Sequence, residues 1–144
     1  MINKICIIVS KFYPKISNML LDGATSEIKK NKKIKYKIFE TPGTLEIPTA
    51  VSMLVKKYDA FVVLGCVIRG QTSHYDFICS SVFQSLMNLS IEKKIPIGNG
   101  ILTCENKSQA ELRANPHKIN KGGAAAQASI SLLKIKFNEK KWII

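Results

Sequence analysis

Residues 59–68 form a run of almost purely apolar side chains that leads directly into an arginine and a glycine. A strand of this composition has no polar face to turn toward water, so both of its faces must be covered. Residues 5–9, an earlier run rich in isoleucine, have the same character. Strands buried on both faces are typical of parallel sheets that carry helices on each side. The chain is therefore expected to adopt an α/β fold.

Strand-like and helix-like segments alternate along the remainder of the chain. Residues 34–39 alternate apolar side chains with lysine, which predicts a half-buried strand near a sheet edge, and residues 95–102 predict a fourth strand. Helices are predicted for residues 16–28, 49–57, 75–89, 108–115 and 124–136. This order predicts a single domain over residues 1–144, with a four-stranded parallel sheet in the flavodoxin-like order 2-1-3-4 and helices on both faces.

Two helix starts carry the spacing of a capping box, in which a serine hydroxyl and an acidic side chain three positions later satisfy free N–H groups. Ser73 and Asp76 have this spacing at the helix of residues 75–89, and Ser108 and Glu111 have it at the short helix that follows. We therefore predict that these serine side chains cap both helices.

The charge of the chain is unusual, with 22 lysine and arginine residues against 10 acidic residues and a formal net charge of +12. Only Arg69 and Arg113 are arginines, whereas nucleic-acid interfaces favour arginine with interleaved aromatic side chains. Lysines spread over helix ends and outer faces are typical of a solvated surface. We predict no nucleic-acid partner, and the excess of positive charge favours an anionic substrate.

The four cysteines, Cys6, Cys66, Cys79 and Cys104, include no C-x-x-C pair and stand mostly in apolar surroundings. They are predicted to be buried free thiols of a reducing compartment, with no metal site because clustered partner ligands are missing. The sequence starts directly with a strand pattern and shows no targeting segment. It also lacks the run of roughly 18 apolar residues that a membrane helix needs. These features predict a cytoplasmic protein without a membrane partner.

Polar side chains gather where the predicted strands end, above all in residues 65–76. Ligands bind at the carboxyl ends of the strands in open parallel sheets. Gln71 and Thr72 stand just before a helix, whose free N–H groups and dipole can hold a phosphate. The Thr72 hydroxyl would add a donor, and Arg113 a bidentate ion pair. A capped helix start without any ligand is the alternative.

Other polar and aromatic side chains near these strand ends allow two interpretations each. His74 is either a proton-transfer group near neutral pH or a surface histidine in the first turn of a helix. Glu46 either accepts hydrogen bonds from a ligand or is an acidic residue favoured at a helix start. Phe12 either stacks on a planar ring or belongs to the core, and Lys121 is either an anion contact or a surface lysine. Arg69 is suited to a carboxylate of a partner or of a neighbouring chain.

The chain contains no G-x-G-x-x-G, Walker, G-x-S-x-G or H-E-x-x-H motif, so the commonest dinucleotide, nucleotide-triphosphate, hydrolase and zinc-protease sites are excluded. Residues 42–48, 65–76 and 120–122 instead match, in order, the signature segments of a known family. Phe12, Leu102-Thr103, Gln109-Ala110 and Arg113-Ala114 support the match. On these residues the chain resembles the 6,7-dimethyl-8-ribityllumazine synthases over nearly its whole length.

The resemblance implies a transferase for the penultimate step of riboflavin synthesis, without a metal or an organic cofactor. Such enzymes condense 5-amino-6-(D-ribitylamino)uracil with 3,4-dihydroxy-2-butanone 4-phosphate and release phosphate and water. By position, the resemblance makes His74 the proton-transfer residue and places Phe12 against the pyrimidine ring. It assigns Thr44, Leu45 and Glu46 to the ribityl chain, Cys66, Val67 and Ile68 to the pyrimidine edge, and Gln71 and Thr72 to the phosphate. Arg113 of a neighbouring subunit and Lys121 complete the implied site.

The chain departs from the family pattern at three places. Asn99 stands where the family often has an aromatic residue, so a hydrogen bond is expected to replace stacking at this position. The loop of residues 114–119 contains a proline, and the N-terminal extension that pairs with the neighbouring subunit is almost absent. Both features favour a free homopentamer over the stacked or sixty-subunit assemblies that the family also forms. A non-catalytic flavin- or lumazine-binding protein of the same fold is the alternative function.

Overall fold

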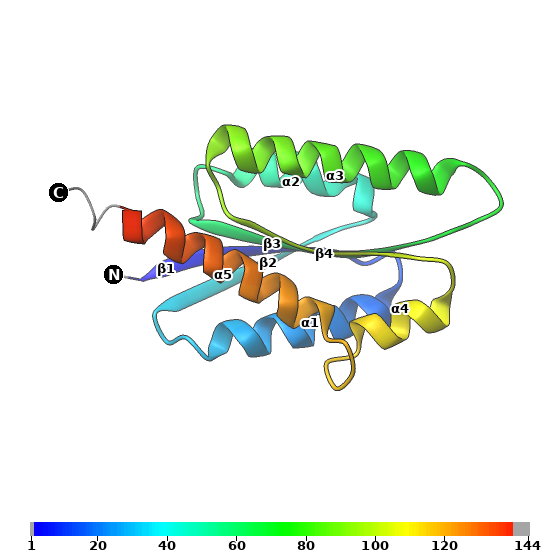
Figure 1. The fold of residues 1–144 in the computed structure, drawn as a ribbon, viewed down its shortest axis with the longest axis horizontal. Coiled ribbons are helices and arrows are strands. Elements are labelled where there is room, and N and C mark those ends of the chain that lie inside the picture. Colours follow the sequence, from blue (N-terminus) through cyan, green and yellow to red (C-terminus); the bar gives the residue numbers. More distant parts are fainter. Residues whose placement is uncertain (1, 140–144) are drawn as a thin grey trace.

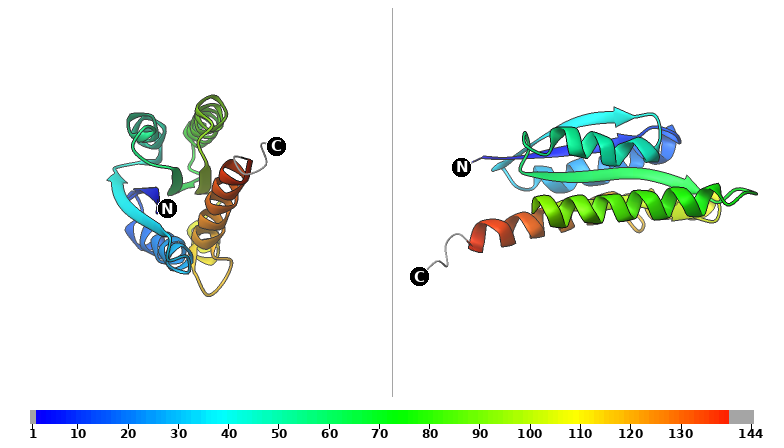
Figure 2. Two further views of the ribbon diagram at one scale, coloured as in Figure 1. Left: turned by 90° about the vertical axis from the view of Figure 1, so that its left-hand side faces the viewer. Right: turned by 90° about the horizontal axis from the view of Figure 1, so that it is seen from above.

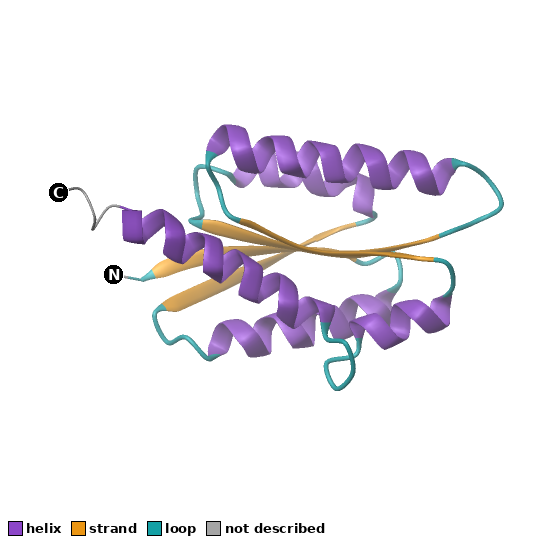
Figure 3. Cartoon of the chain, viewed as in Figure 1, coloured by secondary structure: helices purple, strands orange, loops and turns teal. Residues whose placement is uncertain are grey.

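The computed structural model describes residues 2–139 of the chain and contains one four-stranded sheet (Figure 1, Figure 3). Its strands are β1 (Asn3–Ser10), β2 (Ile34–Thr41), β3 (Ala60–Ile68) and β4 (Ile97–Cys104). All neighbouring strands run parallel, in the order β2-β1-β3-β4. The predicted fold class and strand order are confirmed. The two apolar runs are β1 and β3, the central strands of the sheet. Only these two strands have a neighbouring strand on each side.

Helices cover both faces of the sheet, as the left view of Figure 2 shows. α2 (Ile47–Leu54) and α3 (His74–Lys93) lie on one face, whereas α1 (Pro14–Lys29), α4 (Lys107–Ala114) and α5 (Lys121–Glu139) lie on the other. A 3-10 turn, η1 (Thr44–Glu46), links β2 to α2. Because the strands are parallel, their carboxyl ends and the starts of α1 and α3 share one edge of the sheet.

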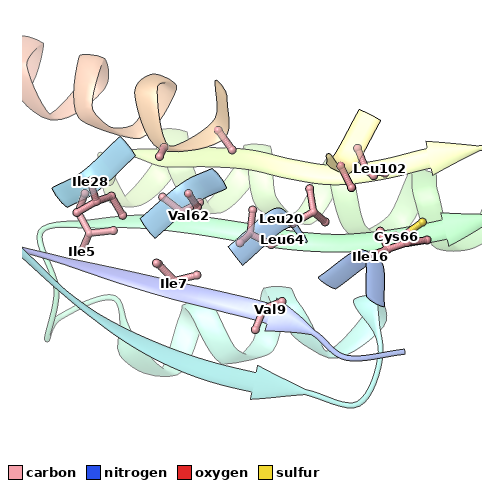
Figure 4. Packing of buried hydrophobic residues seen from close by; sticks show 14 of the residues in the cluster. Ile5, Ile7, Val9, Ile16, Leu20, Ile28, Val62, Leu64, Cys66 and Leu102 are labelled. Atoms are coloured by element: carbon pink, nitrogen blue, oxygen red, sulfur yellow. The ribbon is translucent and has the colours of Figure 1, made fainter. Parts of the chain in front are cut away.

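Alternate side chains of β1 point into two separate cores. Ile5, Ile7 and Val9 pack on the face that carries α1 and α5, and Figure 4 shows them on the same side of the sheet as α1. Cys6 and Ile8 pack on the opposite face, which carries α2 and α3. All five residues are fully buried, and each buried aliphatic side chain contributes roughly 1.5–3 kcal/mol. The absence of polar positions in this strand follows from this two-sided burial.

Glycines let α5 approach its neighbours closely. A methyl group at Gly98 of β4 would collide with the Ala125 carbonyl of α5, and one at Gly122 of α5 would collide with the Leu20 carbonyl of α1. The backbone of α5 therefore packs directly on the backbone of β4 and of α1. This contact fixes the position of Lys121, the first residue of α5, relative to the outer strand of the sheet.

Both predicted capping boxes are wrong. Ser73 precedes α3, but its side chain makes no capping hydrogen bond. Asp76 instead pairs with Arg69, with 3.4 Å between the nearest nitrogen and oxygen atoms. α4 begins one residue earlier than predicted, because the Asn106 side chain accepts a 2.9 Å hydrogen bond from the Gln109 amide. Asparagine and serine are about equally good N-caps, so the capping-box spacing of Ser108 did not exclude a cap two residues earlier, at Asn106.

The ends of other elements also differ from the prediction, and α5 begins three residues earlier, at Lys121. α2 begins two residues earlier, at Ile47, and ends at Leu54. α3 continues to Lys93 and stops where Lys94 adopts a left-handed conformation with a φ of 51°. β4 is shifted by two residues toward the C-terminus, since Pro96 has no N–H group to give to the sheet.

Candidate active site

A hollow of about 400 Å³ opens at the carboxyl edge of the sheet, and we call it the His74 hollow. It is formed by the turn after β1, the η1 turn after β2, the end of β3 and the first turns of α3. It brings together eight of the predicted site residues: Phe12, Thr44, Leu45, Glu46, Cys66, Val67, Ile68 and His74. The wall is mostly apolar and the volume suits a small planar molecule.

Phe12 stands in the turn between β1 and α1, with 66% of its surface exposed. Its ring contacts Tyr13 edge-on, with 5.0 Å between the ring centroids and 74° between the planes. The Ser17 hydroxyl donates hydrogen bonds to the carbonyl groups of Ser10 and Tyr13, which tie the start of α1 to the end of β1. The turn is thus fixed while the Phe12 ring stays open to a ligand. The core interpretation of Phe12 is wrong.

Local hydrogen bonds shape the η1 turn. The Thr41 hydroxyl donates to the Gly43 carbonyl at 2.8 Å, and the Gly43 amide donates to Glu46 Oε1 at 3.2 Å. Thr44 is buried against Gly65 of β3, where an added methyl group would lie 3.1 Å from Thr44 Oγ1. Glu46 therefore holds its own turn with one carboxylate oxygen and can accept a ligand hydroxyl with the other.

His74 is the first residue of α3, and its side chain lines the His74 hollow. Its backbone N–H donates to Thr72 Oγ1 at 3.3 Å. Gln71 and Thr72 themselves are exposed and line neither this hollow nor the second one described below. Within one chain, the structure brings the proton-transfer candidate into the hollow and leaves the two predicted phosphate contacts outside it.

Arg69 is held by carboxylates of its own chain. Its Nε lies 2.9 Å from a Glu105 oxygen, and its Nη1 lies 3.4 Å from an Asp76 oxygen. The guanidinium carbon also lies 4.3 Å from the centroid of the Tyr75 ring. The hydrogen bond with Glu105 raises the pKa of Arg69. Arg69 therefore ties the first turn of α3 to the segment that follows β4, and its predicted contact with a partner or a neighbouring chain stays a prediction.

A second hollow, of about 460 Å³, lies along β4, the outer strand of the sheet. We call it the Arg113 hollow, and it is lined by Phe83 of α3, residues 99–103 of β4, Arg113 of α4 and Lys121 of α5. It shares no lining residue with the His74 hollow. The structure thus separates the predicted site residues, since Asn99, Arg113 and Lys121 belong to the Arg113 hollow and Gln71 and Thr72 to neither hollow.

Arg113 and Lys121 bring unpaired positive charge to the Arg113 hollow. Arg113 Nη1 donates to the Thr103 carbonyl at 3.3 Å and to Cys104 Sγ at 3.4 Å. Neither cation forms an ion pair with a carboxylate of residues 2–139. A guanidinium oriented by a carbonyl and a sulfur keeps its charge available, so this arrangement suits an anion such as phosphate.

Asn99 is exposed on β4, and its side chain folds back on its own strand. Its Oδ1 accepts a 2.9 Å hydrogen bond from the Ile101 amide, which satisfies a backbone group of the outer strand. The amide NH₂ group of Asn99 remains a donor toward the Arg113 hollow.

A model of the 6,7-dimethyl-8-ribityllumazine synthase family matches residues 3–136. The chain belongs to this family. The lumazine synthase of Methylorubrum populi is 43% identical over 140 residues, which cover 92% of this chain and 82% of the relative. That of Bartonella henselae is 44% identical over 136 residues, covering 92% and 87%, respectively. The family resemblance predicted from the sequence is confirmed.

Nine residues that line the two hollows of this lumazine synthase family member were not predicted as site residues: Tyr13, Pro42, Gly43, Ile78, Phe83, Gly100, Ile101, Leu102 and Thr103. Tyr13, Pro42 and Gly43 adjoin predicted residues at strand ends, so the same reasoning could have included them. Ile78 follows His74 by four residues and shares its helix face. Phe83 carried no such signal, because an aromatic residue in the middle of a helix is typical of a core position.

All four cysteines are free thiols, as predicted, but only Cys6, Cys66 and Cys104 are buried, whereas Cys79 is half-buried. Burial raises the pKa of Cys66 to about 12, and the nearby Cys104 adds to the shift. A neutral thiol is a poor nucleophile, so Cys66 contributes an apolar surface to the wall of the His74 hollow. Within residues 2–139, no cluster of three or more His, Cys, Asp or Glu side chains could hold a metal ion. No helix in the same range is long and apolar enough to cross a membrane.

Proposed function

We propose that this chain condenses 5-amino-6-(D-ribitylamino)uracil with 3,4-dihydroxy-2-butanone 4-phosphate, releasing phosphate and water to give 6,7-dimethyl-8-ribityllumazine. This is the penultimate step of riboflavin biosynthesis, and membership of the lumazine synthase family supports it. The observation that carries the proposal is the position of His74 in a mostly apolar hollow of about 400 Å³. That hollow can hold a planar ring beside a group that transfers protons near neutral pH.

The reaction needs little more than positioning and proton transfer. An imine forms between the pyrimidine amino group and the ketone carbonyl. Loss of a proton from the adjacent hydroxyl-bearing carbon then expels phosphate from the next carbon, and the resulting enol rearranges to a second carbonyl. The ribitylamine nitrogen attacks that carbonyl and closes the second ring. Water is lost when each nitrogen attacks a carbonyl, so a proton must leave the nitrogen and another must reach the departing oxygen. We assign these transfers to His74. Holding the two substrates together supplies much of the remaining rate gain.

We assign the ligand contacts as the family resemblance implies them, and the lining of the His74 hollow supports this assignment. Phe12, with its exposed ring, stacks on the pyrimidine. The end of β3, with Cys66, Val67 and Ile68, lies along the pyrimidine edge. The η1 turn holds the ribityl chain through Thr44, Leu45 and Glu46, because the free Glu46 oxygen can accept its hydroxyl groups.

We further propose that each site is shared by two neighbouring copies in a homopentamer. The lining residues of the His74 hollow include no lysine or arginine, although one substrate carries a phosphate. The Arg113 hollow offers Arg113 and Lys121 without carboxylate partners in the described part of the chain. If the Arg113 hollow of one copy faces the His74 hollow of the next, the phosphate gains cations from one chain. Gln71, Thr72 and the start of α3 then hold it from the other.

The reaction is tested by mixing the purified protein with both substrates and following the fluorescence of the lumazine product. We expect product that depends on both substrates and on protein concentration. Complete absence of product with both substrates saturating would overturn the proposal. Tight binding of the lumazine without turnover would instead establish the alternative, a non-catalytic flavin- or lumazine-binding protein. The retained His74 argues against that alternative.

The shared site is tested by subunit complementation. His74→Ala and Arg113→Gln disable different hollows, so each variant alone is expected to be nearly inactive. In oligomers reassembled from an equal mixture, about a quarter of the sites would combine an intact His74 hollow with an intact Arg113 hollow. Recovery of about that fraction of wild-type activity supports the shared site. No recovery in oligomers shown to contain both chains would mean that each chain works alone.

We also propose that the protein acts in the cytoplasm and binds neither nucleic acid nor membranes. Four free thiols, three of them buried, suit a reducing compartment. The lysine excess is a solvated surface in this proposal. Binding to duplex DNA or RNA that weakens steeply with salt would contradict it.

A further inference from the structure

One aromatic side chain in the Arg113 hollow has no role in the function proposed above. Phe83 is the only aromatic residue among the residues that line this hollow. It is half-buried, with part of its ring packed on the core between α3 and the sheet. The remaining surface of the ring faces the hollow. The strand side of the hollow offers small or aliphatic side chains, because β4 contributes Gly100, Ile101 and Leu102 there.

The position of Phe83 on α3 explains how it reaches a different hollow from His74. Phe83 follows His74 by nine residues on the same helix. At about 100° per residue, this spacing turns Phe83 to roughly the opposite side of α3 and moves it roughly 13 Å along the axis. α3 lies over β4, as the left view of Figure 2 shows. One side of the helix therefore lines the His74 hollow, and the opposite side lines the Arg113 hollow.

Asn99 lines the Arg113 hollow together with Phe83 and adds a polar group to its surface. Asn99 contributes no ring, and its Oδ1 is already bonded to the Ile101 amide, so the NH₂ group is its free donor. Arg113 and Lys121 line the same hollow as Phe83 and Asn99. The hollow thus combines an aromatic face, one amide donor and two cations. This combination suits a planar, hydrogen-bonding ring held next to a phosphate.

We propose that Phe83 stacks on the pyrimidine-derived ring that is bound in the His74 hollow of the neighbouring copy, while Asn99 donates a hydrogen bond to the edge of that ring. The inference rests on the proposed function and its shared site. The ring would then lie between Phe12 of one chain and Phe83 of the next. Phe83 is a specificity-determining residue in this arrangement, because it contacts the pyrimidine substrate and leaves the phosphate substrate to the two cations.

The test uses the full chain with Phe83→Leu, which removes the ring but keeps an apolar side chain. We expect the KM for the pyrimidine substrate to rise about threefold to tenfold, as loss of an aromatic contact implies. The KM for the phosphate substrate should stay within about twofold, since the phosphate contacts are intact. Phe83→Tyr, which keeps the ring, should restore the wild-type KM. Phe77→Leu is the matched control, because Phe77 is an exposed phenylalanine of the same helix that lines neither hollow.

A binding measurement separates stacking from a general loss of structure. We expect the fluorescence of the bound lumazine product to be quenched more strongly by Phe83→Trp than by wild type, and less by Phe83→Leu. Equal KM values for wild type and Phe83→Leu, or equal increases for both substrates, would overturn the inference. So would an equal effect of Phe77→Leu. If Phe83→Leu does not assemble, Phe83→Met replaces it with the same expectations. An inactive wild type would contradict the proposed function itself, whereas an active wild type that tolerates Phe83→Leu contradicts only this inference.

Discussion

We propose that proton transfer in the His74 hollow depends on one imidazole, that of His74. Two other ionisable side chains on its wall have pKa values that are raised further above neutral pH. Burial raises the pKa of Cys66 to about 12 and also raises the pKa of Tyr13. Glu46 already uses one oxygen to accept the Gly43 amide at 3.2 Å. We therefore assign proton transfer to His74 rather than to these three side chains.

His74→Ala should lower kcat by about a hundredfold, because general acid–base help is typically worth two to four orders of magnitude and positioning is retained. The KM values and the size of the oligomer should change little, since the imidazole is not part of a core. Single-turnover kinetics and light scattering measure the two effects. His74→Asn, which keeps a polar side chain of similar size, is the control and should be equally slow. An unchanged kcat in either variant would show that His74 takes no part in the proton transfers.

The buried thiols predict loss of stability in alkali. Burial raises the pKa of both Cys6 and Cys66 from an ordinary value of 9.0 to about 12. Above pH 9 the unfolded chain releases these protons while the folded chain keeps them, so the free energy of unfolding should fall as the pH rises from about 9 to about 12. Urea unfolding across that range measures the slope. Cys66→Val should flatten it, and an identical slope in that variant would show that other groups cause the effect.

At the scale of elements, the sequence predicted strands better than helix ends. Residues 5–9 and 59–68 were predicted correctly because two-sided burial leaves few alternatives to a central strand. The start of a helix depends on which of several nearby polar side chains caps it. The side chain that caps α4 is Asn106, and not the serine two positions later. The His74 hollow was predictable because its residues follow strand ends. Phe83 was not, because its role depends on which side of α3 faces the second hollow.

The contact between β4 and α5 predicts the effect of one methyl group. Gly98→Ala should destabilise the protein by about 1–3 kcal/mol, because the new Cβ meets the Ala125 carbonyl and neither backbone can move freely. The shift of α5 should also raise the KM for the phosphate substrate through Lys121. Denaturant midpoints and steady-state kinetics measure these effects. Gly70→Ala is the matched control for stability, since an added methyl group there meets no atom within 4 Å. Equal midpoints for the two variants would contradict this packing argument.

At the scale of the whole molecule, one chain carries two incomplete hollows, and assembly is proposed to join them. Light scattering should give a particle of five chains of 16.1 kDa each. The particle should not dissociate in moderate salt, because exposed apolar side chains such as Met87 and Ile91 of α3 are available to an interface. An active monomer would contradict the shared site, and a much larger particle would contradict only the free pentamer.

α3 carries His74 near its start and Phe83 on its opposite side. In a closed ring of copies, each α3 would then be a wall between two consecutive sites. A copy altered at both positions would impair two sites, while the remaining copies kept their own sequence intact. The activity of a ring that contains both kinds of copy would depend on how the altered and normal copies are arranged around it. In a cell that expresses two alleles, a minority of altered chains would thus suppress more activity than their share of the protein.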